Sequence, residues 1–219
     1  MGALFYGSPH RAPVGLDEDV FRALNQAGSN PALDGIALVL DVSALLYVIV
    51  LWAAQLWVVK KRTLAFDYLL ALLVVVAVTE VLKFAIGRPR PVDDPLLMGN
   101  VHLLTPAFLP DLADPSFPSG HTSRAFVLAA VLGLRDRKWL KWLLPYATAV
   151  GVARVYEGAH FPSDVVGGAL LGFAIGAAFW WLGSHPRYVA LRRRLIGRWL
   201  RPGPVRRSGS TSPPGPTPP

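Results

Sequence analysis

Ionisable side chains stand at the ends of the long apolar runs in this sequence, where a membrane-embedded chain seldom places them. These residues are Lys83, His121, Arg124, Arg154, His160 and Asp164. An ionisable group inside a membrane span costs about 2.5–3.5 kcal/mol on insertion scales, so each is a functional-site hypothesis by default. Cationic and imidazole groups that meet at one membrane interface favour a multiply charged anion, most simply phosphate, as the bound group.

The elements that must position these residues are apolar segments long enough to cross a bilayer, whose core of about 30 Å requires about 20 helical residues. The expected spans are Ile36–Val59, Tyr68–Ile86, Ser119–Leu134, Trp139–Tyr156 and Asp164–Gly183. By parity of crossing, the span ends that carry the ionisable groups all lie on one face of the membrane. The sequence therefore predicts an all-α, polytopic transmembrane helical bundle of about five spans.

The composition favours a membrane protein and argues against other classes. Apolar residues make up 53% of the 219-residue chain and charged residues 16%, whereas a soluble domain carries about a quarter charged residues. The absence of Cys from the sequence excludes disulfides, thiolate metal sites and cysteine nucleophiles. The net charge of +8 is clustered between the apolar runs, so we expect membrane lipids as partners and no nucleic acid.

The chain is expected to divide into four regions. Residues 1–35 lack a signal-peptide pattern and contain a short helix, Asp17–Ala27, which we expect to lie in the membrane interface. Residues 36–183 form the transmembrane domain. Residues 184–201 form a basic juxtamembrane helix held on anionic headgroups, and residues 202–219, rich in Pro, Gly and Ser, are expected to be disordered.

Charge asymmetry predicts the orientation in the membrane. The Lys60–Asp67 loop, the Arg135–Lys141 loop and the tail after Gly183 carry net charges of +2, +3 and +8. The segments on the opposite face, including the Gly87–Pro118 loop and the loop around Glu157, are net acidic. Because Lys and Arg favour the cytoplasmic side, we expect a plasma-membrane protein with a cytoplasmic C-terminus and the ionisable cluster on the outer face.

Three motifs follow one another in order, each at the end of an expected span: Lys83–Pro91 (KxxxxxxRP), Pro118–His121 (PSGH) and Arg154–Asp164 (RxxxxxHxxxD). Over roughly Tyr68–Gly183 the sequence resembles the type 2 phosphatidic acid phosphatase superfamily, the lipid phosphate phosphatases, which includes bacterial undecaprenyl-diphosphate phosphatases. It departs from the family in carrying Ala153 where Ser usually precedes the Arg of the last motif. It also has five expected spans where integral members often have six.

The resemblance implies catalytic roles for three residues. His160 attacks phosphorus as the nucleophile and forms a phosphohistidine. Asp164 accepts the proton of the other ring nitrogen and thereby sets the tautomer of His160. His121 is the general acid toward the leaving oxygen and then activates water.

The resemblance also implies a phosphate-binding set, which comprises Lys83, Arg90, Ser119, Gly120 and Arg154. The three cations hold the non-bridging oxygens, and Ser119 with the Gly120 N–H lies at a helix start, where unpaired amides bind anions. No Asp/Glu cluster of metal-ligand type accompanies these groups in the sequence, so neither a metal nor another cofactor is expected.

The resulting interpretation is a metal-independent phosphatase of a lipid phosphate or pyrophosphate. The substrate expected first is a polyprenyl diphosphate such as undecaprenyl diphosphate, with phosphatidylglycerol phosphate and phosphatidic acid as alternatives. Two other functions stay open: a vanadium-dependent haloperoxidase, because the superfamily's site also holds vanadate, and a non-catalytic protein that binds lipid phosphate. The sequence specifies no oligomeric state.

The remaining charges are expected to be structural. Lys83 has an alternative as the i,i+3 partner of Glu80. Arg124 is expected to have a structural role as the partner of Glu80, Asp41 or Glu157. Arg88 is expected to be solvated or to face headgroups. Asp41 has no evident partner. The loop acids Asp93, Asp94, Asp111 and Asp114 are expected to be solvated, and no role is assigned to His10, His102 or His185.

Overall fold

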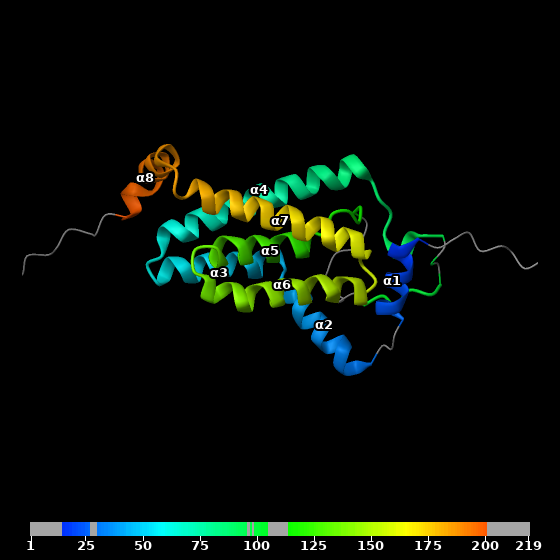
Figure 1. Cartoon of the computed structure of the whole chain (residues 1–219). Coiled ribbons are helices and arrows are strands. Elements are labelled where there is room, and N and C mark those ends of the chain that lie inside the picture. The colour runs from blue at the N-terminus through cyan, green and yellow to red at the C-terminus, as the bar shows by residue number, and fades with distance from the viewer. Residues whose placement is uncertain (1–14, 27–29, 96, 98, 105–113, 201–219) are drawn as a thin grey trace, which may run out of the picture.

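The computed structural model describes residues 15–26, 30–95, 97, 99–104 and 114–200, and in this part of the chain all regular secondary structure is helical. The elements are α1 (Leu16–Asn25), α2 (Pro31–Ser43), α3 (Leu46–Val58), α4 (Arg62–Ile86), the 3₁₀ turn η1 (Pro91–Asp93), α5 (Gly120–Gly133), α6 (Arg137–Tyr156), α7 (Pro162–Leu182) and α8 (Pro186–Leu200). Figure 1 shows a helical bundle with α1 across one end and α8 at the other. The predicted all-α class is confirmed, whereas the tail 202–219 lies outside the described residues.

Helix α5 forms the centre of the bundle and packs against α4, α6 and α7. Its residues from Ala125 onward are largely buried, as expected for a helix surrounded by others. Glycine permits the contact with α7, because a Cβ at Gly168 would lie 2.6 Å from the carbonyl oxygen of Ser119. Membrane helices associate through such close backbone packing. The contact brings together two of the three helix ends that carry motifs.

Judged by helix length and composition, the structure supports fewer membrane spans than the sequence predicted. Among the described residues, α4 and α7 are each long and apolar enough to cross a membrane, and α2 with α3 qualifies only as a pair bent by 59°. The expected span Ile36–Val59 is therefore a broken segment. Helix α5 has 14 residues, about 21 Å of helix, and α6 contains Lys141 and Arg154. Two or three spans are supported, and the predicted five are not confirmed.

The N-terminal helix packs against the protein at the end of the bundle where the motifs lie. Phe21 is completely buried, and its ring lies 5.6 Å from that of Phe161 between centroids. The side-chain amide of Asn25 donates to the carbonyls of Tyr156 and His102, each at 2.7 Å. The expected helix is therefore present, but its largest apolar side chain contacts the loops that follow α6 rather than lipid.

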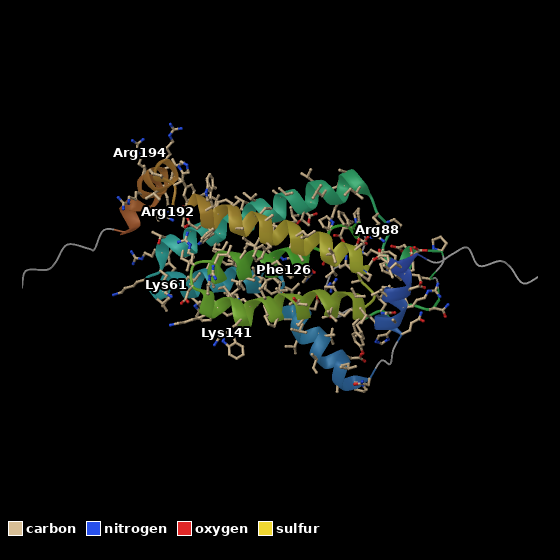
Figure 2. The ribbon with its side chains drawn as sticks, viewed as in Figure 1. Lys61, Arg88, Phe126, Lys141, Arg192 and Arg194 are labelled. Carbon is tan, nitrogen blue, oxygen red and sulfur yellow. The ribbon has the colours of Figure 1, made fainter. Side chains whose placement is uncertain are left out.

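The C-terminal helix α8 is held by the protein through a buried carboxylate. Asp67, in the first part of α4, is fully buried and forms ion pairs with Arg192 of α8 and with Arg135. Tyr188 Oη donates to the same carboxylate at 2.7 Å. Figure 2 shows Lys61, Lys141, Arg192 and Arg194 gathered at this end of the bundle, with Arg88 at the opposite end. The basic segments thus share one end, as the parity argument requires.

Candidate active site

The helix ends of the second and third motifs are joined by a backbone hydrogen bond. The amide of Ser119, the residue before α5, donates to the carbonyl of Asp164 in the first turn of α7 at 3.0 Å. Ser119 is fully buried and its hydroxyl accepts from Thr122 Oγ1 at 3.0 Å. Its side chain makes no capping hydrogen bond to α5. The first amides of the helix, including that of Gly120, are therefore suited to bind an anion.

Lys83 and Arg90 converge on a single carboxylate, that of Asp114. Lys83 Nζ forms an ion pair with Asp114 Oδ2, and Arg90 Nη2 donates to Oδ1 at 2.5 Å. Both cations are buried, whereas 40% of the Asp114 side chain is exposed. Burial by itself raises the pKa of Asp114, but Lys83 and Arg90 outweigh it and lower the pKa to about 2. The expectation that Asp114 is solvated is therefore wrong, and the alternative partner of Lys83, Glu80, is replaced by Asp114.

His160 lies between the arginines of the first and third motifs. Arg90 Nη1 donates to the carbonyl of the preceding residue, Ala159, at 2.8 Å, and the amide of His160 donates to the carbonyl of Arg154 at 3.2 Å. Burial, together with the charges of Arg90 and Arg154, lowers the pKa of His160 to about 3, although Asp164 acts in the opposite sense. The imidazole is therefore neutral at physiological pH, as a nucleophilic nitrogen must be.

The His160 ring faces the Asp164 carboxylate. Nδ1 lies 3.6 Å from Asp164 Oδ2 and has no hydrogen-bond partner among the described residues. Oδ2 also accepts the amide of Phe161 at 2.8 Å, which holds the carboxylate in the first turn of α7. Because Nδ1 faces Asp164, Nε2 is the ring nitrogen available for a substrate. Catalytic contacts of this kind are often long in a ligand-free site and shorten when substrate binds.

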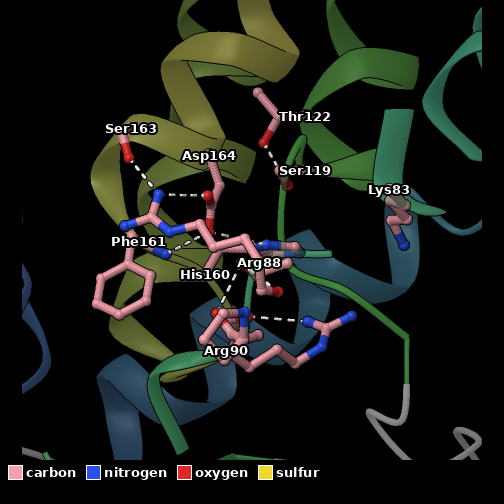
Figure 3. A network of polar contacts seen from close by, with 12 residues as sticks. Lys83, Arg88, Arg90, Ser119, Thr122, His160, Phe161, Ser163 and Asp164 are labelled. Carbon is pink, nitrogen blue, oxygen red and sulfur yellow. Dashed lines mark hydrogen bonds and ion pairs between the residues drawn. The ribbon is translucent and has the colours of Figure 1, made fainter. Parts of the chain in front are cut away.

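Arg88 was expected to be solvated or to face headgroups, but the structure places it against the other side of Asp164. Its Nη1 donates to Asp164 Oδ1 at 2.7 Å and to Ser163 Oγ at 2.5 Å, and its Nη2 donates to Asp17 Oδ2 of α1 at 2.6 Å. The guanidinium also lies 4.2 Å from the centroid of the Phe161 ring (Figure 3). Burial lowers the pKa of Arg88, but the two carboxylates outweigh it and raise the pKa.

His121 and Arg154 meet at a second buried carboxylate, Asp41 of α2. Asp41 Oδ1 accepts from Arg154 Nη1 at 2.5 Å and lies 3.4 Å from His121 Nε2. The same Arg154 nitrogen donates to Glu157 Oε2 at 2.7 Å. Asp41 is fully buried. A charge that appeared isolated in the sequence is therefore the shared partner of two predicted site residues.

The structure thus brings the predicted residues together in linked groups. Lys83 and Arg90 share Asp114, His121 and Arg154 share Asp41, and backbone hydrogen bonds connect these groups to His160, Asp164 and Ser119. Arg124 instead donates to the carbonyl of Ala44, at the break between α2 and α3, at 3.1 Å. Among the described residues, no three His, Cys, Asp or Glu side chains are grouped as a metal site.

Comparison with known proteins identifies the family. The sequence profile of the PAP2 superfamily matches residues 64–187. The chain is 29% identical over 164 residues to the undecaprenyl-diphosphatase of Sulfolobus acidocaldarius, covering 73% of this chain and 74% of that protein. It is 33% identical over 176 residues to phosphatidylglycerophosphatase B of Bacillus subtilis, covering 73% and 79%.

A solved structure has the same fold. The crystal structure of Aquifex aeolicus LpxE superposes with a TM-score of 0.67 at 32% identity, covering 76% of this chain and 96% of that one. The three motifs described above, with the buried Arg90, Arg154 and His160, all lie within the matched region 64–187. The chain therefore belongs to the PAP2 superfamily.

Proposed function

We propose that this chain is a membrane phosphatase that hydrolyses a lipid phosphate or pyrophosphate through a phosphohistidine intermediate. The observation that carries the proposal is the convergence of Lys83 and Arg90 on the two oxygens of Asp114, beside the His160–Asp164 pair. Two cations that hold both oxygens of a carboxylate are arranged to hold two non-bridging oxygens of a phosphoryl group. Substrate binding then requires Asp114 to leave this position.

In the first step, His160 Nε2 attacks phosphorus. The P–N bond forms while the P–O bond to the leaving group breaks, and positive charge develops on the imidazole. Asp164 stabilises that charge through the Nδ1–H, and Arg88 with the Phe161 amide holds the carboxylate in place. His121 gives its proton to the leaving oxygen, so the lipid departs as a neutral alcohol or as a monophosphate.

In the second step, water replaces the histidine at phosphorus. His121, now neutral, takes a proton from the water as its oxygen attacks, the P–N bond breaks, and the bonding electrons return to His160. The products are inorganic phosphate and the starting enzyme. Lys83, Arg90 and Arg154, with the first amides of α5, stabilise the charge on the non-bridging oxygens throughout.

An apolar groove of about 680 Å³ between α2 and α6 supports a lipid substrate. Its walls include Ile36, Leu40, Leu144 and Val152, and it reaches Ala153, the residue before Arg154. A hydrocarbon chain in this groove places its headgroup near the arginine cluster. Relatives named undecaprenyl-diphosphatase and phosphatidylglycerophosphatase B make a polyprenyl diphosphate the first candidate, followed by phosphatidylglycerol phosphate and phosphatidic acid.

The proposed topology keeps five crossings, with α2–α3 as one broken span and α5 and α6 as spans whose polar ends face the site. The basic segments at the α8 end are then cytoplasmic, and the site opens on the outer face of the plasma membrane. The separation of Arg88 from Lys141 and Arg194 in Figure 2 supports this arrangement.

The test is phosphate release by the detergent-purified protein from polyprenyl diphosphate, phosphatidylglycerol phosphate and phosphatidic acid, with EDTA present. We expect turnover of at least one lipid, loss of turnover in His160→Ala, and an acid-labile phosphoenzyme. Activity that survives His160→Ala contradicts the nucleophile assignment. Lipid binding without turnover, or halide oxidation with vanadate and peroxide, would instead favour one of the alternative functions.

A further inference from the structure

Asp41 occupies an unusual place in the fold, at the end of the first half of a broken helix. It lies in the last turn of α2, and its carbonyl accepts the amide of Ala44 at 3.0 Å where the chain turns into α3. The Ala44 carbonyl in turn accepts from Arg124 of α5. The break therefore directs backbone and side-chain oxygens from the first membrane segment toward the start of α5. Irregular backbone at membrane depth is tolerated where protein groups satisfy it.

The Asp41 carboxylate is completely buried, and only one of its two oxygens accepts a hydrogen bond from a described residue. Oδ1 accepts from Arg154 at 2.5 Å and faces His121 Nε2 at 3.4 Å. Oδ2 has no hydrogen-bond partner among the described residues, and neither does His121 Nε2. The Asp41 carboxylate can accept a hydrogen bond from this ring nitrogen, through Oδ1, when the ring carries a proton on Nε2.

We propose that Asp41 is a positioning residue of the reaction, and that it holds His121 in the protonated, general-acid form while it aligns Arg154. The inference rests on the proposed phosphatase function. It assigns the two histidines to two carboxylates: Asp164 orients His160 as a neutral nucleophile, and Asp41 holds His121 as an imidazolium. Two imidazoles with opposite protonation requirements can share a site when their charged surroundings differ in this way.

The charges around His121 explain why a carboxylate is needed there. Burial of the ring opposes protonation of His121 most strongly, and Arg154 of α6, Arg124 of α5 and Lys83 of α4 act in the same direction. Each positive charge opposes protonation of the imidazole. Asp41 of α2 is the carboxylate in direct contact with the ring, while Glu157 reaches Arg154 and makes no described contact with His121. Asp41 is therefore the group placed to favour the imidazolium form of His121 against this burial and these charges.

The proton balance follows from the geometry. The imidazolium holds one N–H toward Asp41 through Nε2 and presents the other to the leaving oxygen. As the P–O bond breaks, the second proton passes to that oxygen, the ring becomes neutral, and Asp41 remains a carboxylate throughout. In the second step a water proton returns to the same ring nitrogen, which restores the imidazolium beside Asp41.

The experiment compares Asp41→Asn with wild type on two substrates, a long-chain alkyl phosphate and p-nitrophenyl phosphate. The alkyl leaving group needs a proton, whereas p-nitrophenolate leaves without one. We expect kcat to fall about 10²-fold or more on the alkyl ester and at most about tenfold on p-nitrophenyl phosphate. The alkaline limb of the pH–kcat profile should move to lower pH. His121→Ala should lose activity on both esters, because it also removes the base of the second step, with the larger loss on the alkyl ester.

Two further variants separate this role from a structural one. Glu157→Gln removes the other acid on Arg154 and should leave the ratio of the two rates as in wild type. Asp41→Glu keeps the negative charge, so the ratio of the two rates should stay as in wild type even if kcat falls. This variant replaces Asp41→Asn in the comparison if Asp41→Asn does not fold. Equal losses on both esters, or an unmoved pH profile, overturn the inference. If wild type hydrolyses neither ester nor lipid phosphate, the proposed function itself fails.

Discussion

At the scale of single residues, the predicted phosphate-binding cations are neutralised by acids of the same chain. Asp114 forms ion pairs with Lys83 and Arg90, and Arg154 forms ion pairs with Asp41 and Glu157. Buried cations require such partners, because an isolated charge in a low-dielectric interior is costly. The partners differ in exposure: Asp41 is fully buried, whereas Asp114 sits on a partly exposed loop. Asp114 is therefore the acid that a substrate phosphate can displace.

Removing the charge of Asp114 should strengthen anion binding. In Asp114→Asn, inorganic phosphate and vanadate no longer compete with a tethered carboxylate for Lys83 and Arg90, so we expect inhibition constants to fall several-fold. Inhibition of p-nitrophenyl phosphate hydrolysis measures this change. Asp93→Asn, in η1 of the same connection, is the matched control and should retain wild-type constants. Weaker inhibition in Asp114→Asn would mean that Asp114 helps to build the anion site.

The buried neutral state of His160 should make stability depend on pH. Its pKa is about 3 in the folded protein and about 6.5 when unfolded, so the unfolded chain binds more protons between these values. Its contribution is therefore complete above about pH 6.5 and is lost as pH falls toward 3. We expect the thermal midpoint in detergent to drop less between pH 7.5 and 4.5 in His160→Gln than in wild type. The exposed His185→Gln should behave as wild type, and parallel slopes for all three would contradict the assignment.

The motif spacing predicted which side chains gather at the site, but not what neutralises them. Lys83 and Asp114 are 31 residues apart, Arg88 and Asp164 are 76 apart, and Asp41 and Arg154 are 113 apart. No local periodicity links such pairs, because their contact depends on how separate helices pack. Arg88 carried a weak signal in its position between Gly87 and Pro89, two residues before Arg90.

At the scale of elements, the sequence predicted helix ends better than helix continuity. Pro162, at the first position of α7, and the left-handed Gly87 after α4 are ordinary start and stop signals. The break between α2 and α3 has no such marker, since Ser43, Ala44 and Leu45 include neither Pro nor Gly. Sharp bends usually fall at those residues. Here the tertiary contact from Arg124 to the Ala44 carbonyl accompanies the break.

The contact between α5 and α7 should tolerate no additional atom at Gly168. In Gly168→Ala the new methyl group lies 2.6 Å from the backbone oxygen of Ser119, so the helices must separate and the Ser119–Asp164 hydrogen bond is strained. We expect at least a tenfold loss of kcat and a lower unfolding temperature. Gly35→Ala in α2 meets no atom within 4 Å and should keep full activity. Unchanged kcat in Gly168→Ala would show that the site does not depend on this packing.

The groove between α2 and α6 should matter for lipids and not for soluble esters. Val152 lines it and is 46% exposed, so Val152→Trp places an indole in the path of the hydrocarbon chain. We expect KM for a long-chain lipid phosphate to rise about tenfold or more, with the kinetics on p-nitrophenyl phosphate unchanged. Leu170→Trp, on an exposed face of α7, controls for a bulky lipid-facing residue. Equal KM values for the lipid in both variants would show that the hydrocarbon chain binds outside the groove between α2 and α6.

At the scale of the whole molecule, the candidate site and the exposed basic residues Lys61, Lys141 and Arg194 lie at opposite ends. Helix α1 adds a lid-like element to the reaction end, where Asp17 accepts the amide of Ser163 at 2.8 Å and pairs with Arg88. Helix α8 adds basic residues to the other end and is tied to α4 through Asp67. Both helices flank the matched family region, and each is anchored by a buried or half-buried carboxylate.

The separation of the basic residues from the candidate site predicts which end of the molecule faces the cell exterior. Because the chain has no Cys, single cysteines can be introduced as unambiguous reporters. Asn100→Cys reports the site end, where Gln26 of α1 donates to its carbonyl, and Lys141→Cys reports the basic end. We expect a membrane-impermeant maleimide to label Asn100→Cys in intact cells and Lys141→Cys only after permeabilisation. Both residues are exposed, so access is limited by the membrane rather than by the fold.

Two comparisons make the labelling decisive. Each variant must release phosphate at the wild-type rate in detergent, which shows that the cysteine has not disturbed the fold. Permeabilised cells must label both positions, which shows that each thiol is reactive. The reverse pattern would place the site on the cytoplasmic face, and labelling of both positions in intact cells would mean that an even number of crossings separates them. The first result inverts the proposed orientation and the second removes the five-span topology, but both leave the chemistry of the site intact, because the catalytic geometry depends on helix ends that meet and not on the side of the membrane they face.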